Sequence, residues 1–148
     1  MRATKLSRSA SHRRLLVKNL STSVLLYEKV KTTPAKARAI QSHAERLITT
    51  AKRWRTAGTT GAKLALYRSL LAETSDRLAA KKLIDVLAAR YADRTGGYTR
   101  RIRLARRLGD GAEQVVVSLT ADRAVEAGSS PSPHAVVETP VPPTPSEA

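Results

Sequence analysis

The sequence predicts an α+β fold in which helices and a three-stranded sheet form two layers. Three observations carry this prediction. Apolar residues recur at helical spacing over residues 12–91, and they alternate with polar residues over residues 98–119. A Gly109-Asp110-Gly111 turn divides the alternating stretch into the two strands of a β-hairpin. The predicted order of elements is therefore helix, strand, three helices and hairpin.

The first helix is predicted to begin near His12, with Ser9 or Ser11 as its N-cap. Residues 1–10 show no apolar period, so we expect them to form an extended basic arm. The helix has one apolar face at the 3.6-residue spacing, which consists of Leu16, Leu20, Val24 and Tyr27.

A strand is predicted next, because residues 27–33 are rich in types that favour extended structure. Thr33 and Pro34 then mark a helix start, with the Thr33 hydroxyl as cap and Pro34 at the first helical position. Gly58 and Gly61 are expected to end this helix in a loop. Its predicted buried face consists of Ala37, Ile40, Ala44, Leu47, Ile48 and Ala51.

The third helix is predicted over about residues 62–72, with Leu66 and Leu70 pointing inward. Residues 74–76 offer three alternative caps for a fourth helix, which are Thr74, Ser75 and Asp76. The buried side of this last helix is predicted to contain Leu83, Ile84, Leu87 and Tyr91.

The hairpin follows two adjacent glycines, Gly96 and Gly97. Ile102 and Leu104 alternate with arginines in its first strand. The second strand alternates through Val115, Val117 and Leu119. Because successive side chains of a strand point to opposite faces, we expect one apolar face and one arginine-rich face. Arg101 and Arg103 are then predicted to point outward.

The charge distribution divides the chain near Thr120. The net charge is +15, from 27 Lys and Arg against 12 Asp and Glu. Residues 121–148 hold one Arg and four acids, a net −3, which leaves +18 on residues 1–120. Six of the seven prolines lie between Pro131 and Pro145. We therefore expect one domain over residues 1–120 that binds a polyanion, and a disordered, Pro-rich acidic tail over residues 121–148.

Several classes of protein are excluded or disfavoured. The absence of cysteine excludes disulfides, cysteine zinc sites and thiol catalysis, and the 3 His are far apart in the sequence. No nucleophile elbow, P-loop or dinucleotide-binding motif is present. The expectation is a protein that is not an enzyme, with no cofactor and no metal. No apolar run long enough for a membrane span and no signal peptide is recognisable, which favours a cytoplasmic location.

Residues 1–27 and residues 94–109 each contain six Lys or Arg and no acid. Such stretches favour nucleic acid as the partner. The residues that we expect to contact it in these stretches are Arg2, Lys5, Arg8, Lys18, Asn19, Arg94, Arg101 and Arg103, and Lys36 is expected to contact it from the basic segment KVKTTPAKAR.

Each predicted contact has a structural alternative. His12 bonds a phosphate or stacks on a base, or else it only caps its own helix. Asn19 contacts the nucleic acid or is a solvated helix residue. Lys31 and the threonines beside the second helix bind phosphate at the helix start, or the threonines serve only as caps. Tyr98 stacks on an exposed base or packs inside the domain.

Four collinear stretches resemble the bacterial L-seventeen family of large-subunit ribosomal proteins. They are SHRRLLVKNLSTSVLLYEKVKTTPAKAR, AERLITTAKR, DRTGGYTRRIRL and GDGAEQVVVSL. The resemblance covers about residues 1–122. The resemblance implies that three motifs, SHR with the following Arg, KTT and GGYTR, contact rRNA. The residues concerned are Ser11, His12, Arg13, Arg14, Lys31, Thr32, Thr33, Gly96, Gly97, Tyr98, Thr99 and Arg100.

The resemblance also implies a role. The chain is expected to be a structural constituent of the large ribosomal subunit, monomeric there, in contact with large-subunit rRNA and neighbouring ribosomal proteins. No membrane and no small-molecule substrate is implied. From the residues alone, a free-standing DNA-binding protein of the nucleoid type stays open as the main alternative. An RNA-modifying enzyme would require convergent acids or a cofactor site, and the helices and hairpin argue against a membrane-surface peptide.

Overall fold

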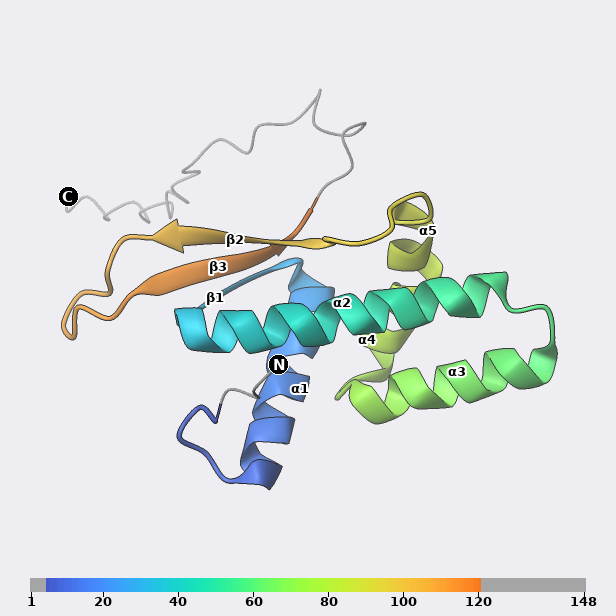
Figure 1. The fold of residues 1–148 in the computed structure, drawn as a ribbon, viewed down its shortest axis with the longest axis horizontal. Coiled ribbons are helices and arrows are strands. Elements are labelled where there is room, and N and C mark those ends of the chain that lie inside the picture. The colour runs from blue at the N-terminus through green and yellow to red at the C-terminus, as the bar shows by residue number, and fades with distance from the viewer. Residues whose placement is uncertain (1–4, 121–148) are drawn as a thin grey trace, which may run out of the picture.

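The helices and strands follow the predicted order in residues 5–120, the part of the chain that the computed structural model describes (Figure 1). Arg2 and the predicted tail lie outside this part. Three consecutive elements over residues 77–90 make up the predicted fourth helix, and the middle one is a π-helical turn. The elements are α1 Ala10–Tyr27, β1 Lys29–Thr32, α2 Pro34–Thr56, α3 Thr60–Glu73, α4 Arg77–Lys82, η1 Leu83–Leu87, α5 Ala88–Arg90, β2 Thr99–Leu104 and β3 Gln114–Leu119.

The sheet is three-stranded and antiparallel, with the order β1-β3-β2. The central strand β3 is therefore the last of the three in the chain. Helices α1 and α2 pack on one face of the sheet, which makes the two layers visible in Figure 1. The predicted α+β class and the three-stranded sheet are confirmed.

The core lies between the helices and the sheet. It is built from aliphatic residues of α1, α2, α3, η1 and β3, as the periodicity predicts. Two tyrosines, Tyr91 and Tyr98, are also fully buried, and their rings lie 5.2 Å apart between centroids. The principal buried aliphatic residues are Val24, Leu25, Ile40, Ile48, Leu70, Leu83, Leu87 and Val117.

The first turn of each of the first two helices differs from its prediction. Leu6 and Ser7 have positive φ, at 55° and 49°, so the described residues before α1, 5–9, form a turn rather than an extended arm. Ser9 is the N-cap of α1 and Thr33 is the N-cap of α2, but neither side chain makes a capping hydrogen bond. The Thr33 carbonyl instead accepts the N–H of Ala37 at 2.9 Å. The predicted hydroxyl cap at Thr33 is therefore wrong, while Pro34 at the start of α2 is confirmed.

Two further details correct the sequence analysis. Tyr27 is 75 % exposed, because α1 buries the face that contains Ser21, Val24 and Leu25 instead. Gly61 does not end α2 but lies in the first turn of α3, which begins after a capping hydrogen bond from the Ala62 N–H to the Thr59 hydroxyl.

Glu28 fastens the junction of α1 and β1 to the fourth helical segment. It ends α1 in a left-handed conformation with φ of 62°. Its carboxylate lies 2.9 Å from Lys82 Nζ and 3.1 Å from Arg90 Nη1. Partial burial opposes ionisation, but the hydrogen bonds and charges of Arg90 and Lys82 outweigh it, so the pKa of Glu28 is lowered.

Glu28 is therefore expected to make folding pH-dependent. Its carboxylate stabilises the fold above its unfolded pKa of about 4.5, and that stabilisation is lost as the pH falls through the lower folded pKa. Glu28→Gln should remove this part of the acid sensitivity, measured by urea unfolding between pH 7 and pH 3. Glu113→Gln is the control, since Glu113 is exposed and forms no ion pair in residues 5–120. An equal effect of both substitutions would contradict the prediction.

Candidate nucleic-acid interface

The pairing of β2 with β3 decides which face each hairpin residue joins. Arg101 lies opposite Val117, and Arg103 lies opposite Val115. Opposed residues point to the same face of a sheet, and both valines are buried under the helices. Arg101 and Arg103 therefore belong to the face that the helices cover, which we call the helix side.

Ile102 and Leu104 join the other face, which we call the open side, and each is 41 % exposed. The prediction of one apolar and one arginine-rich face is therefore wrong. The reason is register: residues 105–113 connect the strands so that odd-numbered residues pair with odd-numbered ones. A shift by one residue would have exchanged the faces.

Arg101 and Arg103 are nevertheless exposed. Strand β2 is an edge strand, paired only with β3. The turn that joins β2 and β3 projects past the start of α2 (Figure 1). The two arginines thus belong to the helix side of an edge strand, and their side chains are accessible to a ligand.

The same register brings the KTT motif beside the arginines that follow the GGYTR motif. Thr32 lies opposite Val115 on one side of β3, and Arg103 lies opposite Val115 on the other. Two strand spacings separate their backbones, which is about 10 Å. The start of α2 follows directly, with Thr33 and Lys36 half-buried and no acid in its first turn. Unpaired N–H groups at a helix start favour an anion.

The open side gathers a second group of cations. Lys29 and Arg100 both lie opposite Ser118, and Lys31 and Ile102 both lie opposite Val116. Sequence reasoning placed Lys29 and Lys31 together on one face but missed the apolar residues that share this face. The signal that would have found these residues is the β2–β3 register. The apolar residues on this face are Ile102, Leu104 and Val116.

The GGYTR motif mainly stabilises the fold of the domain. Gly97 has φ of 65°, which a residue without Cβ adopts at no steric cost. Tyr98 then turns inward and is only 1 % exposed. Its hydroxyl lies 3.2 Å from the carbonyl oxygens of Arg94 and Thr95, and Lys52 Nζ lies 5.6 Å from its ring centroid. Packing is thus the alternative that the structure shows, because the buried ring presents no exposed face to a base.

The residues beside Tyr98 also make contacts inside the domain. The Thr99 hydroxyl donates to Glu45 Oε1 at 2.8 Å, and Gln41 Nε2 donates to the Thr99 carbonyl at 3.4 Å, so α2 holds the start of β2. Arg94 Nε donates to the Gly96 carbonyl at 3.2 Å. Arg100 is the first side chain of the motif that is exposed on the sheet.

The predicted contacts at the start of α1 form a separate group. The helix has 18 residues, so its start lies about 27 Å from the sheet, to which its C-terminal end leads (Figure 1). Arg13 is half-buried and the others are exposed, and the residues of this group are Lys5, Arg8, Ser11, His12, Arg13 and Arg14.

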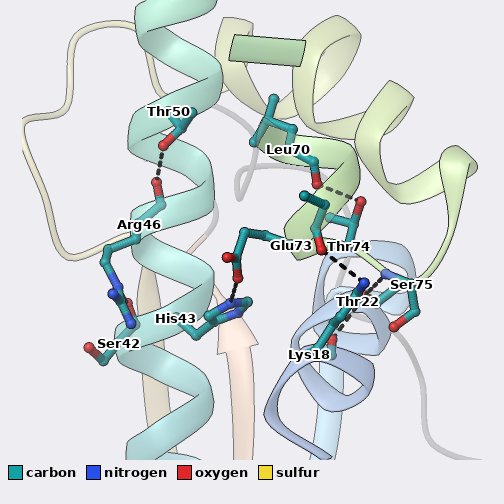
Figure 2. Close-up of polar contacts among 11 residues, drawn as sticks. Lys18, Thr22, Ser42, His43, Arg46, Thr50, Leu70, Glu73, Thr74 and Ser75 are labelled. Carbon is teal, nitrogen blue, oxygen red and sulfur yellow. Dashed lines mark hydrogen bonds and ion pairs between the residues drawn. The ribbon is translucent and has the colours of Figure 1, made fainter. Parts of the chain in front are cut away.

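Lys18 and Asn19 belong neither to the two faces of the sheet nor to the group at the start of α1. Lys18 Nζ donates to the Ala72 carbonyl at 2.9 Å, and the Ser75 hydroxyl donates to Asn19 Oδ1. The Ser75 N–H donates to Thr22 Oγ1 at 3.1 Å, so α1 is fastened to the end of α3. Figure 2 shows Lys18 and Thr22 beside this end. The two predicted contact residues are therefore engaged inside the domain.

A second contact fastens the same end of α3 to α2. His43 Nε2 lies 2.9 Å from Glu73 Oε2, as Figure 2 shows. The hydrogen bond with His43 lowers the pKa of Glu73. This carboxylate is thus used within the domain, which leaves the surface charge of the helices mostly positive.

Other kinds of site find little support in residues 5–120. No group of three or more His, Cys, Asp or Glu is placed there to hold a metal ion. None of the helices in that range combines the length and hydrophobicity that crossing a membrane requires. The chemistry that the described surface offers is cationic and hydrogen-bonding, which suits a phosphate backbone.

Comparison with known proteins identifies the family of this chain. The family model for ribosomal protein L17 matches residues 16–120. The large ribosomal subunit protein bL17 of Endomicrobium trichonymphae is 38 % identical over 116 residues, which cover 78 % of this chain and 92 % of the relative. That of Trichlorobacter lovleyi is 40 % identical over 120 residues, covering 81 % and 90 %. The chain therefore belongs to the ribosomal protein L17 family, which is a structural and not an enzymatic family.

Proposed function

We propose that this protein is a structural constituent of the bacterial large ribosomal subunit and that it binds large-subunit rRNA directly. The observation that carries the proposal is the clustering of family motifs on the sheet. Lys31 and Thr32 of KTT lie on β1, and Arg100 of GGYTR lies on β2 with Arg101 and Arg103. All five belong to a sheet whose strands contain no acid.

The proposed mechanism is charge neutralisation combined with fit to a folded RNA. Arginine forks bind phosphate oxygens in two-point contacts, and lysines add point charges. The exposed residues at the start of α1 supply a second contact region, about 27 Å from the sheet. A rigid domain with two such regions recognises the shape of an RNA rather than its sequence. Its proposed setting is the cytoplasmic ribosome, beside other large-subunit proteins.

The salt dependence of binding is the expected signature. For a footprint of roughly six phosphates, log K against log salt should fall with a slope of about −4 to −5. Filter binding of the full chain to protein-free large-subunit rRNA between roughly 50 and 300 mM KCl measures it. A slope near zero would contradict an electrostatic mechanism.

Competition by duplex DNA tests the alternative function in the same assay. A folded rRNA should retain the protein in the presence of an equal mass of duplex DNA, because the proposed fit is to RNA shape. Equal competition by DNA would favour a DNA-binding protein instead.

A further inference from the structure

The register of the hairpin divides its cations between two opposite faces. Arg100 lies opposite Ser118 and points to the open side. Arg101 and Arg103 lie opposite buried valines and point to the helix side. All three are exposed. A surface that bound one RNA from one side would leave the cations of the other side unused.

Neighbouring strands extend each face into a separate cationic surface. On the open side, Lys29 and Lys31 of β1 join Arg100 across β3. On the helix side, Thr32 and the start of α2 join Arg103 across the same strand. Side chains of the two sets leave the sheet in opposite directions. Each face therefore has its own binding groups from more than one element.

Acids within the described residues do not neutralise either face. The three strands contain no Asp or Glu. Three of the nearest acids have other partners: Glu28 pairs with Arg90 and Lys82, Glu45 accepts from Thr99, and Asp110 pairs with Arg107. Glu113, directly before β3, is the remaining exposed acid beside the hairpin strands and forms no ion pair within residues 5–120. The excess of cations over acids on both sides favours an anionic partner on both sides.

Apolar exposure supports contact at the open side and at the tip of the hairpin. Ile102 and Leu104 are each 41 % exposed among the cations of the open side. Leu108, in the turn between β2 and β3, is 97 % exposed. Exposed aliphatic side chains beside cations suit the sugar faces of a nucleic acid backbone, where the methylene surfaces of ribose lie between phosphates.

The geometry points to a hairpin inserted between two separate segments of rRNA, one held by each face, so that the protein links them. This inference rests on the proposed function. Two phosphate backbones repel each other at distances within a Debye length of about 8 Å. A cationic layer one sheet thick, placed between them, replaces that repulsion by attraction on both sides. An acidic protein segment on one face is the competing occupant.

Two variants with the same change of charge separate the faces. Lys31→Ala/Arg100→Ala removes two cations from the open side, and Arg101→Ala/Arg103→Ala removes two from the helix side. All four side chains are exposed, so circular dichroism should show both variants folded. Hydroxyl-radical footprinting of the full chain on protein-free large-subunit rRNA then reports which nucleotides each face protects.

Each variant is expected to lose protection, by about fivefold or more, in a different RNA segment, and the two segments should not overlap or adjoin in sequence. Loss of the same or directly adjoining nucleotides in both variants would mean one RNA strand at the edge of β2 and would overturn the inference. Loss in only one variant would leave the other face to a protein and would also overturn it. No protection by the unmodified chain would instead refute direct rRNA binding itself.

Discussion

Tyr98→Ala is expected to lower the free energy of unfolding by about 3–5 kcal/mol. The side chain is 1 % exposed, and its ring packs against Tyr91 at 5.2 Å between centroids. Its hydroxyl also bonds the segment before the hairpin, at the carbonyls of Arg94 and Thr95. Alanine removes the ring, leaves a cavity and frees that segment. Urea unfolding followed by circular dichroism measures the loss.

Tyr98→Phe separates packing from any contact with RNA. It keeps the ring and removes only the hydroxyl, so we expect a loss of about 1 kcal/mol. Its affinity for rRNA should stay within about twofold of the unmodified chain, because the ring is buried. A Phe variant that folded well but bound rRNA much more weakly would contradict the structural role. So would a Tyr98→Ala variant with unchanged stability.

Arg101→Glu/Arg103→Glu is expected to weaken rRNA binding by about 100-fold at roughly 0.1 M salt. Two lost phosphate contacts account for most of this, since each is worth nearly a tenfold change at that salt concentration, and the new carboxylates repel phosphate in addition. The two arginines form no ion pair within residues 5–120, so the variant should remain folded. Filter binding measures the affinity.

Arg53→Glu/Arg55→Glu is the matched control. It makes the same change of four charge units at the other end of α2, about 30 Å from the start of that helix. Both arginines are exposed. A tenfold or smaller loss is expected there. Equal losses in the two variants would mean that net charge alone governs binding, against a specific role for the hairpin.

The elements of the fold were predictable because their signals are local. The apolar period of α2 from Ala37 to Ala51 agrees with the buried residues of that helix. Pro34 fixes the start of α2, and Asp76 caps α4 by accepting the N–H of Leu78 at 2.8 Å. The alternation of Val115, Val117 and Leu119 likewise identified the buried face of β3. Each of these depends on neighbours within a few positions.

The site was less predictable because it depends on contacts that are distant in the sequence. The face of Arg101 follows from its pairing with Val117, which the length and path of the turn decide. The engagement of Lys18 follows from the position of Ala72, 54 residues later. Tyr98 precedes a strand whose residues 100–104 are exposed, and only the helix layer beneath it explains its burial. The sequence motifs therefore predicted the family better than the orientation of individual residues.

Sedimentation of a tagged copy of the full chain in native lysate, with sequencing of the RNA that it carries, tests whether the protein is part of the large ribosomal subunit. We expect the protein to sediment with large subunits, to resist a moderate salt wash and to carry large-subunit rRNA. A protein that stayed free, or that sedimented with chromosomal DNA, would contradict this expectation.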